Sequence, residues 1–319
     1  MFTKKTSMAL AALAALTMAA AASAQETKVG IGISGWTGFA PLTLAKEAGI
    51  FKKNGLDVSI KKIPQKDRHL AIMSGDIQCA ATTVETWIVW NANGIAATQI
   101  FQLDKSYGAD GMVVKPAITK ISDLKGKTVA ASAPGTAPYF TLAWMLSKNG
   151  LSVKDVNVVN LEPQAAANAM IAGTANLDAA MTYEPYLSAV REKPEAGKII
   201  ATTLDYPMIM DTFGCTPKFL AENPKAAKAL ADGYFDALAM IAAEPAKSFG
   251  IMGAAVKQTA EKFEASQKFL RWQDRAANQK FFAGEHLQFS KEAAQLLLEA
   301  GIIRQIPDLT KLADTRFIQ

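Results

Sequence analysis

One order of predicted elements, strand-helix-strand-helix-strand, occurs twice along this chain, and this repetition restricts the fold more than any other feature. The first copy has its strands at residues 28–33, 58–60 and 77–81. The second copy has its strands at residues 127–132 and 156–160 and in an apolar run that ends at Met181. Matching positions such as Leu56 and Leu151 lie 95 to 99 residues apart. We therefore expect an α/β protein with two similar lobes.

Four loops of these two lobes are expected to face one another. Strands that alternate with helices form mostly parallel sheets, and ligand-binding loops follow the carboxyl ends of such strands. The loops predicted at these ends are 34–39 and 81–87 in the first lobe and 133–137 and 182–186 in the second. We therefore expect a ligand cleft between the lobes, with Trp36 at its mouth.

The chain is expected to pass between the lobes twice, so that they hinge against each other. We interpret residues 112–116 as the outgoing crossing and residues 199–203, followed by 207–214, as the return. The predicted boundaries are 25–115 and 204–319 for lobe 1 and 116–203 for lobe 2. The helical pattern of the C-terminal region predicts helices that pack on lobe 1.

Residues 1–24 have the pattern of a signal peptide. Lys4 and Lys5 precede an alanine-rich run at 8–21, which is shorter than the roughly 20 residues that span a membrane. The segment Ala22-Ser23-Ala24 suits signal peptidase, so we expect cleavage after Ala24 and export to the periplasm. No cysteine lies near this position, and we expect no lipid anchor.

The remaining 295 residues are long enough for two domains, and half of the whole chain is hydrophobic. Loss of Lys4 and Lys5 would lower the formal net charge from +5 to +3, which is too small for a nucleic-acid surface.

Cysteine and histidine are rare in this chain. Its two cysteines, Cys79 and Cys215, could form a disulfide after export, but the apolar surroundings of Cys79 favour two buried free thiols, which we take as the expected state. These residues and the two histidines, His69 and His286, lack metal-ligand spacing. Known catalytic and nucleotide-binding motifs are also missing. We expect no metal, no cofactor and no catalytic residue.

The predicted cleft loops carry hydroxyl, acidic and aromatic side chains. Hydroxyl groups beside unpaired N–H groups at helix starts can hold an anionic oxygen, although ordinary helix capping is the alternative for each of them. Acids and aromatic rings together suit an ammonium or guanidinium group, although such acids can also be simply solvated. The hydroxyl candidates are Ser34, Thr37, Thr82, Thr83, Ser132 and Thr136, the last beside Gly135. The acids are Glu85, Asp104, Asp110, Glu184 and Asp211, and the rings are Trp36, Trp87, Tyr107, Tyr139 and Tyr183.

Five segments resemble the periplasmic binding proteins of taurine, aliphatic sulfonate and nitrate ABC importers, and the likeness extends from about Lys28 to Gln319. These segments are Ala45-Lys46-Glu47-Ala48-Gly49-Ile50-Phe51, Ser74-Gly75-Asp76-Ile77, Ile121-Ser122-Asp123-Leu124-Lys125-Gly126-Lys127, Thr182-Tyr183-Glu184-Pro185-Tyr186 and Phe219-Leu220-Ala221-Glu222-Asn223-Pro224. The resemblance implies the two-lobed type II periplasmic-binding-protein fold with two hinge crossings. It also implies a monomer that delivers a small solute to an ABC permease with a cytoplasmic ATPase.

The chain looks most like the taurine-binding branch of this family. The resemblance implies that Asp211 receives a substrate amine, that Asp110 stands where the branch has glutamate, and that Thr136 and Tyr139 match its second-lobe loop. Asp104 and Glu184 are additional acids, and Thr82 and Thr83 replace a serine pair. This excess of acid fits a more basic nitrogenous solute than taurine.

Two other functions stay open from the sequence. A pyrimidine-precursor synthase shares the general fold, but it works inside cells and uses a cysteine-rich motif that this chain lacks. A receptor that docks to a chemosensor is the third possibility. The sequence does not decide among taurine, sulfonates, nitrate and a basic nitrogen compound.

Overall fold

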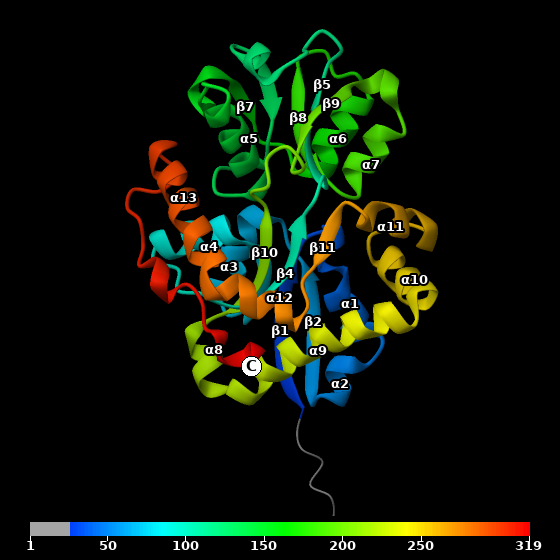
Figure 1. Cartoon of the computed structure of the whole chain (residues 1–319), viewed down its shortest axis with the longest axis vertical. Helices are drawn as coiled ribbons and strands as arrows, with labels where there is room; N and C mark the ends of the chain where they lie inside the picture. The colour runs from blue at the N-terminus through cyan, green and yellow to red at the C-terminus, as the bar shows by residue number, and fades with distance from the viewer. Residues whose placement is uncertain (1–25) are drawn as a thin grey trace, which may run out of the picture.

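The computed structural model describes residues 26–319, which form two lobes that each contain one β-sheet (Figure 1). The signal peptide and its cleavage after Ala24 lie outside the described residues. No helix between residues 26 and 319 is long and apolar enough to cross a membrane. Within the same range, no group of three acidic, histidine or cysteine side chains could hold a metal ion.

Lobe 1 contains a six-stranded sheet of order β11-β4-β10-β3-β1-β2. Its strands are β1 (Thr27–Ile33), β2 (Leu56–Lys62), β3 (Cys79–Thr83), β4 (Thr98–Ser106), β10 (Met210–Cys215) and β11 (Leu270–Trp272). β1 pairs in parallel with β2 and β3, and β10 pairs antiparallel with β3 and β4.

Lobe 2 repeats this plan in a five-stranded sheet of order β7-β6-β8-β5-β9. Its strands are β5 (Asp110–Val114), β6 (Thr128–Ala130), β7 (Asn157–Val159), β8 (Ala179–Tyr183) and β9 (Lys198–Thr202). β6 is parallel to β7 and β8, whereas β5 is antiparallel to β8, as β10 is to β3. The predicted two-lobed α/β fold is therefore confirmed.

Helices cover both sheets, and several begin with a proline that needs no N–H partner in the first turn. Lobe 1 has α1 (Ala40–Glu47), α2 (Ile50–Lys53), α3 (Arg68–Met73) and α4 (Val84–Ala92). Lobe 2 has α5 (Ala137–Lys148), α6 (Pro163–Ile171) and α7 (Tyr186–Arg191). The C-terminal region adds α8 (Pro217–Glu222), α9 (Pro224–Ala243), α10 (Pro245–Ala255), α11 (Ala260–Gln267), α12 (Arg275–Lys280) and α13 (His286–Glu299).

The C-terminal helices differ in what they cover. α9 and α10 contact α1 and share the core of lobe 1, as expected. α13 instead packs against α4 of lobe 1 and α5 of lobe 2, and in Figure 1 it rises beside the upper lobe. Phe289, Ala293 and Leu297 of α13 are buried in one hydrophobic cluster with Val84 and Phe140. α13 thus packs on lobe 1, as predicted, and its apolar face also reaches lobe 2, which the sequence did not predict.

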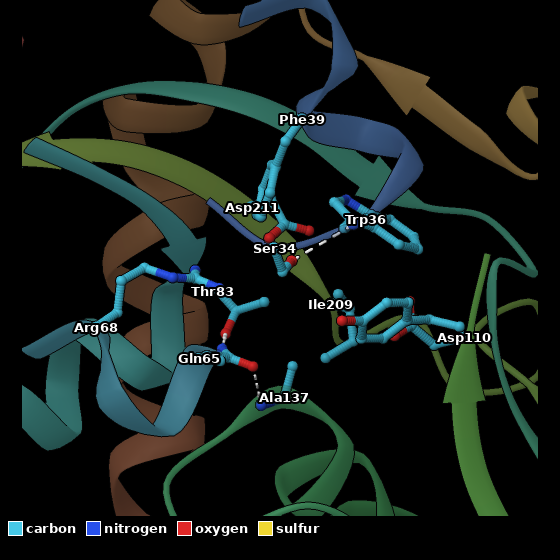
Figure 2. Close-up of a pocket in the computed structure, with 11 residues that line it drawn as sticks. Ser34, Trp36, Phe39, Gln65, Arg68, Thr83, Asp110, Ala137, Ile209 and Asp211 are labelled. Carbon is cyan, nitrogen blue, oxygen red and sulfur yellow. Dashed lines mark hydrogen bonds between the residues drawn. The ribbon is translucent and has the colours of Figure 1, made fainter. Parts of the chain in front are cut away.

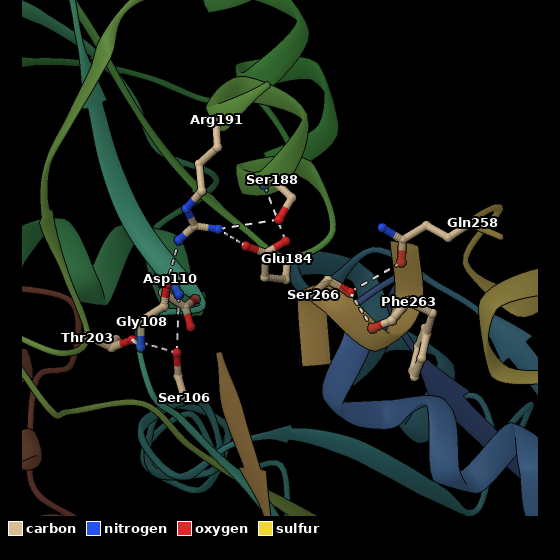
Figure 3. A network of polar contacts seen from close by, with 10 residues as sticks. All are labelled: Ser106, Gly108, Asp110, Glu184, Ser188, Arg191, Thr203, Gln258, Phe263 and Ser266. Carbon is tan, nitrogen blue, oxygen red and sulfur yellow. Dashed lines mark hydrogen bonds and ion pairs between the residues drawn. The ribbon is translucent and has the colours of Figure 1, made fainter. Parts of the chain in front are cut away.

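The two crossings lie side by side at residues 107–109 and 203–209. The hydroxyl oxygens of Thr203 and Ser106 are 2.6 Å apart, and Thr203 Oγ1 also accepts the N–H of Gly108 at 2.8 Å (Figure 3). Residues 110–114 were expected in lobe 1, with the crossing at 112–116. They form β5 in the second sheet instead, because Asp110 pairs with Tyr183 and Val114 with Ala179 of β8.

Cys79 and Cys215 form a disulfide, so the expectation of two free thiols is wrong. The physical reason is the register of the sheet, since Cys79 on β3 stands directly opposite Cys215 on β10. Their Cα atoms are 3.9 Å apart although 136 residues separate them in the sequence. The apolar surroundings of Cys79, which favoured a thiol, suit a buried disulfide equally well.

Candidate functional site

A small hollow of about 270 Å³ lies where the two lobes meet (Figure 2). Lobe 1 and its crossing strand β10 contribute most of the lining, and Ala137 of α5 and Tyr183 of β8 close it from lobe 2. The lining residues are Ser34, Trp36, Phe39, Gln65, Arg68, Thr83, Asp110, Ala137, Tyr183, Ile209 and Asp211. The hollow therefore lies in the predicted interlobe cleft, and part of its volume is open to solvent.

Two carboxylates line this hollow without a cationic partner. Asp211 lies near the start of β10 and Asp110 begins β5, and their exposed fractions are 3% and 4%. Oδ2 of Asp110 accepts no hydrogen bond from residues 26–319. Within the same part of the chain, Asp211 forms no ion pair, and only the more distant charge of Arg68 favours its ionised form. Buried carboxylates of this kind are strongly destabilising unless a bound group compensates their charge.

Burial shifts the pKa values of these acids upward. It raises the pKa of Asp110 to about 7, and the charge of Glu184 adds to the shift. Burial also raises the pKa of Asp211 well above its usual value, with further repulsion from Asp104, Asp110 and Glu85. A cation bound in the hollow would favour the ionised forms.

The lining contains one guanidinium group and two carboxyl groups. Arg68 is 1% exposed, but its guanidinium donates to the backbone carbonyls of Ile63 and Ala81 and forms no ion pair within residues 26–319. Burial lowers its pKa to about 10, which keeps the group positive at neutral pH. With Asp110 and Asp211 ionised, the one guanidinium balances one of the two carboxylates. A ligand with a single positive charge would balance the lining when both carboxyl groups are ionised.

Aromatic rings form one wall of the hollow. Trp36 and Tyr183 meet across the lobes in an edge-to-face contact with ring centroids 5.5 Å apart, and Phe39 lies beside them. Asp104 lies behind Trp36 and accepts its indole N–H at 3.2 Å. This bond fixes the orientation of the ring, so Asp104 is a positioning residue and does not line the hollow.

A polar seam joins the lobes on the opposite side of the hollow. The Gln65 amide donates to the hydroxyls of Thr82 and Thr86, each at 2.8 Å, and its oxygen accepts the N–H of Ala137 at 3.1 Å. Thr86 in turn donates to the carbonyl of Gly135 at 3.2 Å. The loop before α5 thus contacts side chains of lobe 1 instead of an open space.

Several predicted site residues lie away from the hollow. Glu184 faces Arg191, with which it forms an ion pair, and accepts the N–H of Ser188 (Figure 3). The Thr136 hydroxyl donates to its neighbour Ala133 at 2.7 Å. The remaining predicted residues outside the lining are Thr37, Thr82, Glu85, Trp87, Tyr107, Ser132, Gly135 and Tyr139. Thr82 and Gly135 take part in the seam, whereas Thr37 and Tyr139 touch no lining residue through a side-chain hydrogen bond in the described chain.

The structure brings Trp36, Thr83, Asp110, Tyr183 and Asp211 together in the lining. The sequence analysis did not single out Gln65, Arg68, Phe39, Ala137 or Ile209, which also line it. The polar segment after β2 carried no motif that marks a site, since a lone glutamine and a lone arginine in a helical pattern usually face solvent. Only the 99% buried guanidinium of Arg68 identifies that segment as part of the site.

The lobes are closed on each other around the hollow. Besides the aromatic contact and the seam, Thr37 N–H donates to the carbonyl of Glu184 at 3.4 Å, and Lys262 of α11 forms an ion pair with Glu192 after α7 at 3.1 Å. A ligand in the hollow would therefore have to enter while these contacts are open.

The sequence model of the family described as NMT1/THI5 like matches residues 36–248 of this chain. The taurine-binding periplasmic protein of Escherichia coli (strain K12) is 26% identical over 230 residues, which covers 69% of each chain.

Two solved structures show the same fold. The alkanesulfonate-binding protein SsuA of Xanthomonas axonopodis pv. citri, bound to MOPS, superposes with a TM-score of 0.77 at 16% identity over 91% of this chain and 98% of its own. The desulfurization enzyme DSZB superposes with a TM-score of 0.64 at 14% identity over 92% and 97% of the two chains. The second likeness shows that an enzyme can have this fold.

Proposed function

Because this chain belongs to the NMT1/THI5-like family, we propose that it is the periplasmic solute-binding component of an ABC importer. It captures a small solute between its lobes as a monomer and delivers the solute to a membrane permease with a cytoplasmic ATPase. The taurine-binding relative supports this function, as do the two-lobed fold and the hollow at the lobe interface.

The ligand is a small organic monocation with N–H donors, such as guanidinium or a primary ammonium compound. The observation that carries this assignment is the pair Asp110 and Asp211, two buried carboxylates that face the hollow without a cationic partner from residues 26–319. Charge-assisted hydrogen bonds from nitrogen to carboxylate are about twice as strong as neutral ones. Trp36 and Tyr183 add ring surfaces that attract a cation.

Purely anionic ligands fit this hollow less well than cations. A sulfonate or nitrate would have to approach Asp110 and Asp211, and the single lining cation, Arg68, directs three of its five N–H groups to two carbonyls. Taurine carries an ammonium group that Asp211 could accept, but its sulfonate would need donors elsewhere in the hollow. We therefore expect affinity to decrease from guanidinium to taurine to nitrate.

Isothermal titration of the purified protein with guanidinium, methylammonium, taurine, methanesulfonate and nitrate tests this function. We expect Asp211→Asn to weaken guanidinium binding by at least about 30-fold, because it removes one partner of a buried charge pair. The control is Asp57→Asn, which changes an exposed carboxylate on β2 and should leave affinity unchanged. Tight sulfonate or nitrate binding by the wild type, or unchanged guanidinium affinity of Asp211→Asn, would contradict the assignment.

We also propose that the protein does not catalyse a reaction. The site supplies carboxylates, rings and amide groups that hold a ligand, and the disulfide removes both thiols of the described chain from nucleophilic chemistry. Incubation with the ligands that bind, followed by mass spectrometry, should return each of them unchanged. A receptor that serves a chemosensor would show the same binding, and uptake assays in cells that lack the permease distinguish the two roles.

A further inference from the structure

The side chain of Gln65 reaches from lobe 1 to the first N–H group of α5 in lobe 2. Its amide lies between α5 of lobe 2 and three threonines of lobe 1, at the edge of the hollow (Figure 2). The backbone N–H of Ala137 can only donate, so the atom that accepts it at 3.1 Å is the amide oxygen. The amide nitrogen therefore faces the hydroxyls of Thr82, Thr83 and Thr86.

These contacts occupy both N–H groups and the oxygen of the Gln65 amide. The two N–H groups match the two closest hydroxyls, those of Thr82 and Thr86, at 2.8 Å each, and Thr83 lies farther away at 3.3 Å. The hydroxyl of Thr86 donates a hydrogen bond to the carbonyl of Gly135 in lobe 2. Gln65 and Thr86 thus form a continuous chain of hydrogen bonds from lobe 1 to the loop and first residue of α5.

The first N–H groups of a helix have no partner inside the helix and attract anions. In α5, the N–H of Ala137 is bonded to Gln65, and Pro138 has none to offer. A ligand can therefore no longer use these first two positions. The amide of Gln65 supplies the oxygen that an anionic ligand group would have brought, and it does so without charge.

We propose that Gln65 is a specificity-determining residue of this cleft, which closes the lobes without help from an anionic ligand group and thereby favours solutes that carry only a positive charge. This inference rests on the proposed function and deepens it. Closure here depends on a protein amide, while the ligand has only to neutralise Asp110 and Asp211.

The variants Gln65→Ala and Gln65→Glu test this proposal together, with Gln164→Ala as the matched control. Gln65→Ala removes the oxygen that Ala137 needs, whereas Gln65→Glu keeps an oxygen acceptor at the same place. Gln164 is exposed at the outer groove of the cleft and makes no side-chain hydrogen bond within residues 26–319. Stopped-flow fluorescence gives the association and dissociation rates of guanidinium, and calorimetry gives affinities for guanidinium and taurine.

Loss of one neutral hydrogen bond that exists only in the closed state should raise the dissociation rate of guanidinium about 3- to 10-fold in Gln65→Ala, with little change in association. Gln65→Glu keeps an acceptor for the Ala137 N–H, so its dissociation rate should rise less than that of Gln65→Ala. Gln164→Ala should stay within about threefold of the wild type. Because Gln65→Ala frees the Ala137 N–H for a sulfonate, the preference for guanidinium over taurine should fall about tenfold or more in this variant alone.

The outcomes separate this proposal from the function on which it rests. If the wild type binds guanidinium and Gln65→Ala keeps the wild-type dissociation rate and preference, the role of Gln65 is wrong and the binding function stands. An increased dissociation rate without any gain in relative taurine affinity overturns the specificity role. If the wild type binds no cation, the proposed function fails directly, whatever the variants do.

Discussion

Single carboxyl groups decide how this cleft responds to pH. Burial raises the pKa of Glu85 to about 8 and, together with Glu184, that of Asp110 to about 7, so both acids are partly or mostly protonated at neutral pH when no cation is bound. Guanidinium keeps its charge throughout this range. A cation that binds the ionised carboxylates must therefore displace protons.

We predict that guanidinium affinity rises as the pH increases from about 6 to about 8.5, by up to about tenfold per pH unit for each proton displaced. Titration calorimetry in buffers of different ionisation enthalpy measures both the affinity and the number of protons released. In Asp110→Asn, guanidinium affinity should depend less on pH around pH 7. An affinity that falls with increasing pH would show that the ligand binds the protonated form.

The stability of the ligand-free protein should fall as the pH rises, whereas the affinity for guanidinium rises. The folded-state pKa values of Glu85 and Asp110 lie above the ordinary carboxyl values near 4, so the folded state binds more protons than the unfolded state between about pH 4 and pH 8. Their contribution to stability is thus largest below pH 4 and is lost as the pH rises through 7 and 8. The ligand should therefore raise the melting temperature most at alkaline pH.

Individual site residues could be predicted from the sequence only where their position in the fold marked them. Thr83 and Trp36 lie in loops that follow predicted strands, so the expected topology brought them to one place. Asp211 lies in the predicted return crossing, and the family resemblance singled it out. Glu184 lies at such a strand end too, but its side chain turns to Arg191, and sequence spacing does not reveal that partner. Gln65 and Arg68 contribute through tertiary contacts that no local pattern encodes.

At the scale of elements, one side chain, that of Arg191, connects α7 to the first crossing between the lobes. Arg191 at the end of α7 donates to the carbonyl of Gly108 in the first crossing at 2.9 Å and pairs with Glu184 after β8 (Figure 3). Its guanidinium also stacks on Phe269, 4.0 Å from the ring centre. Burial raises the pKa of the Glu184 carboxyl, and the charge of Arg191 opposes this shift and favours the ionised form.

We predict that Arg191→Ala lowers the free energy of unfolding by about 3 kcal/mol, because it leaves a buried carboxylate without its cation. Urea denaturation measured by circular dichroism checks this value. The loss in free energy of unfolding should be smaller at pH 5, where Glu184 can take up a proton. Arg304→Ala, at an exposed arginine near the C-terminus, is the control and should change stability by less than about 0.5 kcal/mol. An equal loss in both variants would contradict the role of Arg191.

The order of elements was predictable because each lobe alternates short apolar strands with helices that have clear starts and ends. The placement of β5 was not, because its apolar run reads the same whichever sheet it joins, and its partners β8 and β9 lie about 65 to 90 residues farther along the chain. The disulfide depends on the same kind of information. Only the pairing of β3 with β10 shows that Cys79 faces Cys215.

At the scale of the whole molecule, the described state is closed, with contacts between lobes on both sides of the hollow. We predict that the ligand-free protein populates a more open form. Small-angle X-ray scattering should show a radius of gyration that decreases on addition of guanidinium toward about 19 Å, the value of a compact chain of this length. An unchanged radius at saturation would mean that binding does not require closure.

Cys79 precedes the first crossing in the chain and Cys215 follows the second, and both belong to strands of lobe 1. The disulfide between them therefore closes a covalent ring that contains all of lobe 2. One break of the backbone anywhere between these cysteines opens the ring but releases no fragment. A molecule nicked in lobe 2 by a protease should therefore migrate as one species in a denaturing gel without reductant, and as two after reduction.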